Sequence, residues 1–343
     1  MDYVKLFQLH EIITPVNPMG READQHSRRW ARKCGLVLTE ESDRRLAATR
    51  PGMLAAHCYP SASLPNLRVL ADWMTWLFSL DDQVDEGPLG RHPDLLERAF
   101  AGGVACLENS DAAHAKNPLW IALHDLVRRF SKRIPEGLEY RFRHHVMDYF
   151  RACVWQAAHR QGAIPDLETF PQMRRDAGAI MPSFDLIEFS VGAALPTELY
   201  YSATYQRLLI SAANVVCWTN DVMTVEKEMA RGDDQNLILV VQKNKGISLD
   251  AATADVIRRI RDQIKRFLKA EEELPHTLDE LLMGDGQRDT VARCVALLRA
   301  WMRGHVDWGQ VTARYLEIDR SDGHPAYLEN LLQRQQSVIG EVP

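Results

Sequence analysis

Apolar residues recur at helical spacing through most of this chain. In residues 250–270 they form one stripe, and charged side chains occupy the opposite face. That pattern predicts an amphipathic helix of about five turns. Similar stripes predict further helices over residues 38–49, 64–81, 94–107, 117–133, 136–160, 205–231 and 288–317.

The segments between these stripes contain residues that stop helices, as in "RPGM", "EGPLGRHPD" and "RQGAIPDL". Alternating strand patterns bounded by Asn-Gly or Asp-Gly turns are absent from the sequence, as are fixed repeats and linkers rich in Gly, Ser or Pro. We therefore expect one all-α domain of roughly ten helices. It would cover residues 1–343, with an N-terminal segment at 1–20 and a C-terminal tail at 321–343.

Composition narrows the class of protein. The 343 residues are 46% hydrophobic, which is enough for a large core. A net charge of −6 without a basic block argues against a nucleic-acid partner. Six scattered cysteines without a CxxC pair indicate reduced, buried thiols. Because the sequence also shows neither a signal peptide nor an apolar run long enough to cross a bilayer, we expect a soluble, cytoplasmic protein.

One apolar helix runs directly into acids, in "WLFSLDDQVDEG" at residues 76–87. Asp81 and Asp85 are four positions apart, so both carboxylates leave the same face of the helix. Two such carboxylates repel each other unless a cation lies between them, and hard oxygen donors suit Mg²⁺. Taken alone, the motif fits a solvated helix end equally well. The sequence does not decide whether Asp82 or Glu86 would also contact a metal.

A second polar stripe follows another apolar helix, in "NDVMTVEKE" at residues 220–228. Asn220, Thr224 and Glu228 fall at i, i+4 and i+8, with Lys227 beside them. Asn and Thr inside a helix cost helix propensity, so a purely structural helix would not need them here. Three oxygen donors and a lysine favour a Mg²⁺ ion that also contacts a phosphate.

A third set is mostly cationic: Arg174 and Arg175 in "MRRDAG", and Arg314 with the neighbouring Tyr315 in "TARYLE". An arginine can bind two phosphate oxygens at once, and a tyrosine hydroxyl adds a donor. Each residue alone is more often a surface or salt-bridge residue. Together with two sets of oxygen ligands, they predict a site for a diphosphate.

These motifs resemble those of the bacterial class I terpene synthases, from about residue 15 to 320. "DDQVD" is similar to the aspartate-rich motif of that family, and "NDVMTVEKE" matches its second motif at every fixed position. "RY" resembles the family's C-terminal arginine–tyrosine pair. Arg174 lies 46 positions before Asn220, a separation typical of the family's diphosphate-sensing arginine. Two departures are Thr224 in place of the commoner Ser, and Ala177 where Asp or Thr is common.

The resemblance implies a helical fold around a central active-site cavity and three Mg²⁺ ions. Metal-assisted departure of the substrate's diphosphate would leave an allylic carbocation that the cavity cyclises. Farnesyl diphosphate is the favoured substrate and geranylgeranyl diphosphate the alternative. By resemblance, Asp81 and Asp85 would hold two ions, and Asn220, Thr224 and Glu228 the third. The diphosphate would be bound by Arg174, Lys227, Arg314 and Tyr315. Gly178 matches a small residue whose carbonyl faces the substrate.

Aromatic side chains near these motifs could stabilise a cation and exclude water. Phe78 lies one turn before Asp81 and is the first candidate for the cavity wall. Trp308, six residues before Arg314, is the second. Trp73 and Trp76 could equally belong to the core, and packing is an equally good explanation for each of the four rings.

Two other functions compete with a terpene cyclase. A prenyl-chain elongating synthase would share the first motif, but its second motif would again be aspartate-rich. A non-catalytic all-α binding protein would not need complete sets of metal ligands. The resemblance also suggests a homodimer, whereas the product cannot be inferred from the sequence.

Overall fold

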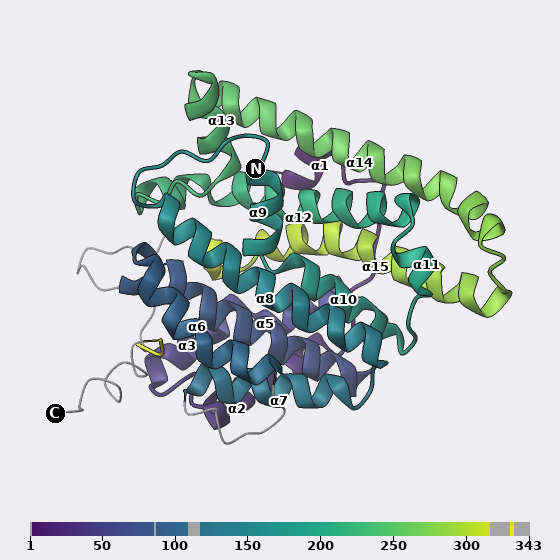
Figure 1. The fold of residues 1–343 in the computed structure, drawn as a ribbon, viewed down its shortest axis with the longest axis horizontal. Coiled ribbons are helices and arrows are strands. Elements are labelled where there is room, and N and C mark those ends of the chain that lie inside the picture. The colour runs from purple at the N-terminus through teal and green to yellow at the C-terminus, as the bar shows by residue number, and fades with distance from the viewer. Residues whose placement is uncertain (1, 86, 109–116, 316–329, 333–343) are drawn as a thin grey trace.

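The computed structural model describes residues 2–85, 87–108, 117–315 and 330–332 (Figure 1). Every regular element in these ranges is helical, which confirms the predicted all-α class. The α-helices are α1 (Tyr3–Phe7), α2 (Gly20–Cys34), α3 (Glu40–Thr49), α4 (Pro51–Cys58), α5 (Leu64–Asp85), α6 (Pro93–Glu108), α7 (Pro118–Ser131), α8 (Glu136–His159), α9 (Phe170–Ala177), α10 (Ile180–Val191), α11 (Thr197–Tyr200), α12 (Ala203–Ala230), α13 (Leu237–Lys245), α14 (Leu249–Glu280) and α15 (Asp285–Gly309). Two 3₁₀ helices are η1 (Pro88–Arg91) and η3 (Ala313–Tyr315).

The expectation of roughly ten helices was too low, because short helices such as α9 and α11 contain too few turns to show an apolar period. The helix predicted over 250–270 extends to Glu280 through Pro275. Leu274 and Leu278 continue its buried stripe while Pro275 is exposed, so packing maintains the helix across the proline. The helix predicted over 288–317 ends at Gly309, and residues 316 and 317 lie outside the described ranges. Of the predicted tail at 321–343, only residues 330–332 lie inside them.

Helices α5 and α12 carry the two sets of candidate oxygen ligands, and both pack among other helices. α12 packs against α14 and α15, and α5 packs against α2 and α4. α10 contacts α8, α15 and α12. Figure 1 shows α14 along one edge of the molecule and α2 and α7 at the opposite edge. The acidic end of α5 and the polar end of α12 both line one cavity between these helices.

Aromatic side chains of α5 anchor it in the core. Trp73 and Trp76 are fully buried and stack with ring centroids 5.1 Å apart. The indole N–H of Trp73 donates to Ser183 Oγ at 3.0 Å, and that of Trp76 donates to the Leu119 carbonyl at 2.9 Å. Both rings are thus core residues whose polar groups are hydrogen-bonded. The sequence had allowed either this packing role or a place in the cavity wall.

Helix α12 is apolar enough to raise a question about membranes. By length and composition it could cross a bilayer, but 83% of its apolar window is buried inside the protein. It is the one such helix among the residues described. Because its apolar residues pack against α14 and α15, it has the character of a core helix.

Candidate active site

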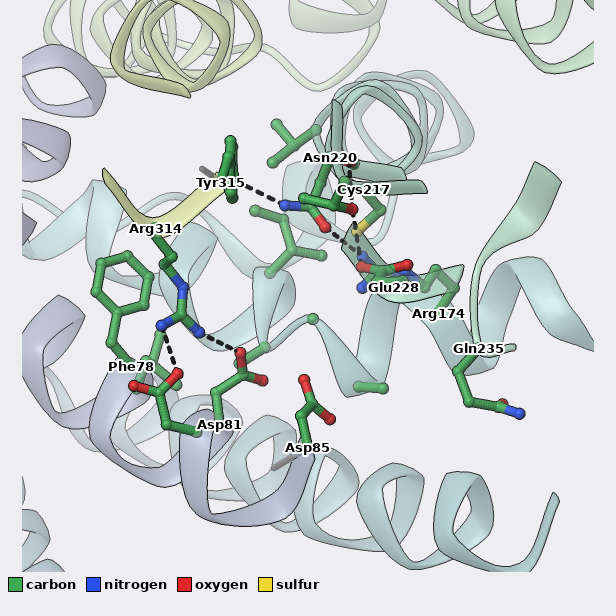
Figure 2. Close-up of a pocket in the computed structure, with 18 of the residues that line it drawn as sticks. Phe78, Asp81, Asp85, Arg174, Cys217, Asn220, Glu228, Gln235, Arg314 and Tyr315 are labelled. Carbon is green, nitrogen blue, oxygen red and sulfur yellow. Dashed lines mark hydrogen bonds and ion pairs between the residues drawn. The ribbon is translucent and has the colours of Figure 1, made fainter. Parts of the chain in front are cut away.

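A cavity of about 210 Å³ lies between α5, α8, α9, α10, α12 and α15. It collects all the candidate site residues that the sequence predicted. Those residues are Phe78, Asp81, Asp85, Arg174, Gly178, Asn220, Thr224, Lys227, Glu228, Trp308, Arg314 and Tyr315. Figure 2 shows the acids of α5 on one side of this cavity, with Asn220, Glu228 and Arg174 on the other.

The acids at the end of α5 are paired with arginines from distant segments. Arg314 donates from Nη2 to Asp81 Oδ2 at 2.6 Å and from Nη1 to Asp82 Oδ1 at 2.5 Å. Asp85 Oδ1 accepts from Arg160 Nη2 at 2.5 Å. Burial and the charge of Asp85 still raise the pKa of Asp81 to about 7, despite Arg314. Burial and the neighbouring acid therefore penalise the charged form of Asp81 more than Arg314 stabilises it. Glu86 lies outside the described residues.

Arg160 was not predicted from the sequence. Its side chain is only 4% exposed, and it also binds Asp233 Oδ2 at 2.9 Å and the Gly90 carbonyl at 3.4 Å. It links the end of α5 to the loop that follows α12. Its partners Asp85 and Asp233 are 75 and 73 positions away in sequence, so no local pattern could have identified the pairing.

One face of α12 presents the second set of oxygens. Thr224 Oγ1 lies 2.7 Å from Glu228 Oε1 and 2.9 Å from the Asn220 carbonyl. Glu228 Oε2 accepts from Asn236 Nδ2 at 2.7 Å. Burial, together with the charges of Asp221 and Asp233, raises the pKa of Glu228 to about 7. As at Asp81, burial and neighbouring acids together penalise the charged form of this carboxyl group.

Arg174 connects the cavity to α12 from the end of α9. Its Nε donates to Asp221 Oδ1 and its Nη2 donates to Asn220 Oδ1, both at 2.8 Å. Asp221 is fully buried, and its Oδ2 accepts from the backbone N–H of Leu237. Arg175 points elsewhere, with Nη1 on Asn214 Oδ1, and it does not line the cavity. The two adjacent arginines therefore occupy different environments.

The break between α9 and α10 lies against Arg174. Ala179 has a left-handed φ of 48°, so the helical path is interrupted between Ala177 and Ile180. A Cβ on Gly178 would lie 3.1 Å from Arg174 Nη1 and 3.3 Å from Cys217 Sγ. Glycine at this position therefore gives the arginine room beside the backbone. Gly178 and Ala177 both line the cavity.

The segment after α15 carries the remaining donors. Tyr315 accepts a hydrogen bond from Asn220 Nδ2 at 2.7 Å. Lys227 Nζ donates to the Arg314 carbonyl at 2.5 Å. η3 is thereby attached to α12 and, through the Arg314 guanidinium, to α5.

Phe78 and Trp308 form an aromatic wall of the cavity. Their rings are nearly parallel, at 16°, with centroids 5.5 Å apart. The Arg314 guanidinium lies over the Phe78 ring, 4.4 Å from its centroid. Trp308 is only 1% exposed, and its indole N–H donates to the carbonyls of Thr49 and Arg50. Phe78 thus already contacts a cation, which its sequence position did not reveal.

The donor chemistry fits Mg²⁺. Asp81 and Asp85 supply carboxylates, and Asn220, Thr224 and Glu228 supply amide, hydroxyl and carboxylate oxygens on one helix face. Within the described ranges, no three acidic, His or Cys side chains form a closed cage. Mg²⁺ fits such open sets, because it binds one or two carboxylates and retains water or phosphate oxygens.

Comparison with known proteins agrees with this geometry. Residues 72–266 match the model of "Terpene synthase family 2, C-terminal metal binding". The chain is 42% identical to (-)-delta-cadinene synthase of Streptomyces clavuligerus over 89% of this chain and 93% of that protein. It is 32% identical to (+)-T-muurolol synthase of Roseiflexus castenholzii, over 89% and 92%.

A solved structure of linalool/nerolidol synthase from Streptomyces clavuligerus superposes with a TM-score of 0.78 at 25% identity. The match covers 87% of this chain and 98% of that one. The sequence relatives, the family match and the helical fold all agree with the resemblance that the motifs suggested. The chain belongs to the terpene synthase family, as one of the bacterial class I terpene synthases.

Proposed function

We propose that this terpene synthase cyclises farnesyl diphosphate with the help of Mg²⁺. The observation that carries the proposal is the single cavity in which two sets of oxygen donors, several cationic side chains and an aromatic wall face one another. The choice of farnesyl diphosphate is supported by the relative from Roseiflexus castenholzii, whose name specifies cyclisation of that substrate. Geranylgeranyl diphosphate is the alternative.

In this proposal, the two sides of the cavity hold metal. Asp81 and Asp85 would bind two ions, and Asn220, Thr224 and Glu228 a third. Bound Mg²⁺ would neutralise charge that develops on the departing diphosphate. The raised pKa values of Asp81 and Glu228 support this assignment, since burial and neighbouring acids penalise each carboxylate and a bound cation would offset both effects.

Arg174, Lys227, Arg314 and Tyr315 would bind the diphosphate. Arg314 now binds Asp81 and Asp82, so the guanidinium would have to exchange at least one carboxylate for phosphate oxygens. Metal binding to Asp81 favours that exchange, because it removes the negative charge that holds the arginine there. The carbonyl of Gly178 would face the ionising carbon, and Phe78 and Trp308 would exclude water from the carbocation.

The direct test supplies purified enzyme with geranyl, farnesyl or geranylgeranyl diphosphate and identifies products by gas chromatography–mass spectrometry. We expect cyclic fifteen-carbon products with Mg²⁺. EDTA should abolish their formation, and added Mg²⁺ should restore it. Cyclic products from geranylgeranyl diphosphate alone would replace the substrate assignment. Unchanged turnover in EDTA would contradict the proposed role of the metal.

Phe78 should control both product and substrate binding. Phe78→Ala removes a cation–π contribution of roughly 0.5–2 kcal/mol and opens space beside the reacting chain. We expect early-quenched or acyclic alcohols and slower turnover. If the ring contacted only the hydrocarbon chain of the substrate, the Michaelis constant would stay similar to that of the wild type. The contact between Arg314 and this ring changes that expectation, because the variant also loses a support for a diphosphate-binding arginine.

Phe78→Tyr and Phe78→Trp should retain cyclisation better than Phe78→Leu, because the ring face matters beyond bulk. Product profiles and Michaelis constants of the four variants provide the measurement. A wild-type product at the wild-type rate from Phe78→Leu would make this ring an ordinary packing residue.

We also propose that residues 1–343 act as one domain, in the cytoplasm and as a homodimer. The family resemblance supports the dimer. Size-exclusion chromatography with light scattering would show a mass of twice 39.1 kDa for that state. A monomer at the working concentration would contradict it.

A further inference from the structure

His305 is a buried polar residue of the cavity that the proposed reaction does not use. It lies on α15 and is 6% exposed. Its Nε2 is 2.9 Å from the Tyr315 hydroxyl, and its Nδ1 is 3.5 Å from Thr219 Oγ1. No sequence motif includes it, yet it is one contact away from the arginine–tyrosine pair.

Four side chains form a continuous series of hydrogen bonds, which we call the Arg174–His305 chain: Arg174, Asn220, Tyr315 and His305. It crosses the cavity wall from α9 through α12 and η3 to α15. The polarity of each bond follows from its first member, because a guanidinium can only donate. Asn220 must therefore present Oδ1 to Arg174 and Nδ2 to Tyr315.

The same reasoning fixes the other end of the Arg174–His305 chain. Since Asn220 Nδ2 donates to the Tyr315 oxygen, the hydroxyl hydrogen of Tyr315 is directed to another acceptor. His305 Nε2 is that acceptor, which requires an unprotonated Nε2 and places the ring hydrogen on Nδ1, toward Thr219. Thr219 can receive it, since its own hydroxyl donates to the Val216 carbonyl at 3.0 Å.

Charge around the ring agrees with this assignment. Burial, with a smaller effect of the Arg174 charge, lowers the pKa of His305 to about 4. The imidazole is therefore neutral at physiological pH and can accept a hydrogen bond.

Gly309 leaves room for the Tyr315 ring, because a Cβ there would lie 2.9 Å from that ring and 2.6 Å from Met223 Cε.

We propose that His305 is a positioning residue for the third metal site, which acts by holding the Tyr315 hydroxyl as an acceptor for Asn220. This inference rests on the proposed function, since it assumes that Asn220 Oδ1 binds the metal. Without the acceptor nitrogen, the Tyr315 hydroxyl would compete for other acceptors. The Asn220 amide, with its oxygen toward the cavity, would then be held at its Oδ1 end by Arg174 alone, without a fixed acceptor at its Nδ2 end.

Two conservative substitutions distinguish positioning from packing. The Oε1 of His305→Gln can take the place of Nε2, whereas the shorter side chain of His305→Asn reaches only the position of Nδ1. Isothermal titration calorimetry would measure the binding of Mg²⁺ and inorganic diphosphate to the metal-free enzyme. We expect His305→Gln to bind nearly as well as wild type. His305→Asn should bind roughly tenfold to a hundredfold more weakly, the usual effect of an unsatisfied buried group.

A double-mutant cycle tests the route through Tyr315. If His305 acts through that hydroxyl, His305→Asn should add no loss of binding to Tyr315→Phe. His305→Phe, which fills the same space without a nitrogen, should behave like His305→Asn and serves if the latter does not fold. Melting temperatures of the metal-free variants control for general destabilisation.

Equal binding by the Gln and Asn variants, or losses that multiply in the double mutant, would overturn the positioning role alone. A wild-type enzyme that does not bind Mg²⁺ with diphosphate would overturn the proposed function and this inference together.

Discussion

Glu228→Gln should abolish cyclisation and leave the protein folded. The substitution keeps the shape of the side chain but changes which atom faces the cavity. Asn236 Nδ2 donates to one oxygen of Glu228, so a glutamine would turn its carbonyl oxygen toward Asn236. Its NH₂ group would then face Thr224 and the expected cation. A metal ligand is thereby replaced by a donor that repels the metal.

We expect the effect to exceed roughly a hundredfold in kcat/KM, because losing a group that only supports a metal ligand typically costs 10–100-fold. The fold should persist, since Thr224 can still donate to the Asn220 carbonyl and accept from the new amide. Removal of a negative charge near Asp221 and Asp233 also relieves repulsion.

Glu226→Gln is the matched control, because Glu226 lies on the same helix but is exposed and does not line the cavity. It should cyclise at the wild-type rate. Turnover should be measured across a Mg²⁺ titration, together with the melting temperature of each metal-free protein. Normal turnover by Glu228→Gln at limiting Mg²⁺ would show that this carboxylate is not a ligand.

Arg174→Lys should lose most activity, and Arg175→Lys should lose little. The guanidinium of Arg174 donates hydrogen bonds to both Asp221 and Asn220. Arg174 also lines the cavity, where we expect the diphosphate to bind. A lysine keeps the charge but cannot bind two groups in a fork. We expect roughly a hundredfold loss of kcat or more, in the range found when one fixed donor to a developing anion is removed.

Arg175 is the internal control for this prediction. It contacts Asn214 away from the cavity, so its replacement changes neither the metal ligands nor the donors to the diphosphate. Steady-state kinetics with farnesyl diphosphate would compare the two variants at saturating Mg²⁺. Similar losses at both positions would mean that the effect comes from packing of α9, since only one of the two side chains enters the cavity.

Helical periodicity was sufficient to predict most of the long helices, although it missed α2, and it placed each set of candidate oxygen ligands on one helix face. The spacing of Asp81 and Asp85, and of Asn220, Thr224 and Glu228, determines a shared face wherever the helix is regular. The structure places these five residues around one cavity. Their roles as ligands stay predictions until variants such as Glu228→Gln are measured.

Contacts between distant segments could not be predicted in this way. Arg160 lies between two acids that are more than 70 positions away, and Phe78 lies under Arg314 from the other end of the chain. Such pairs depend on how helices cross, which a single sequence does not encode as a local pattern. His305 was missed for a related reason, since a lone histidine in an apolar stripe resembles an ordinary core residue.

Helix α12 carries apolar lining residues in one part and the candidate oxygen ligands in the next, and this separation has an evolutionary consequence. Val216 and Cys217 line the same cavity roughly one turn before Asn220, where the oxygen donors begin. Substitutions in this apolar part can reshape the space around the hydrocarbon while the groups that would release the diphosphate stay in place. We therefore expect single substitutions at Val216 to change the product of an enzyme that stays active. A lineage built on this helix could diversify its chemistry without passing through inactive ancestors.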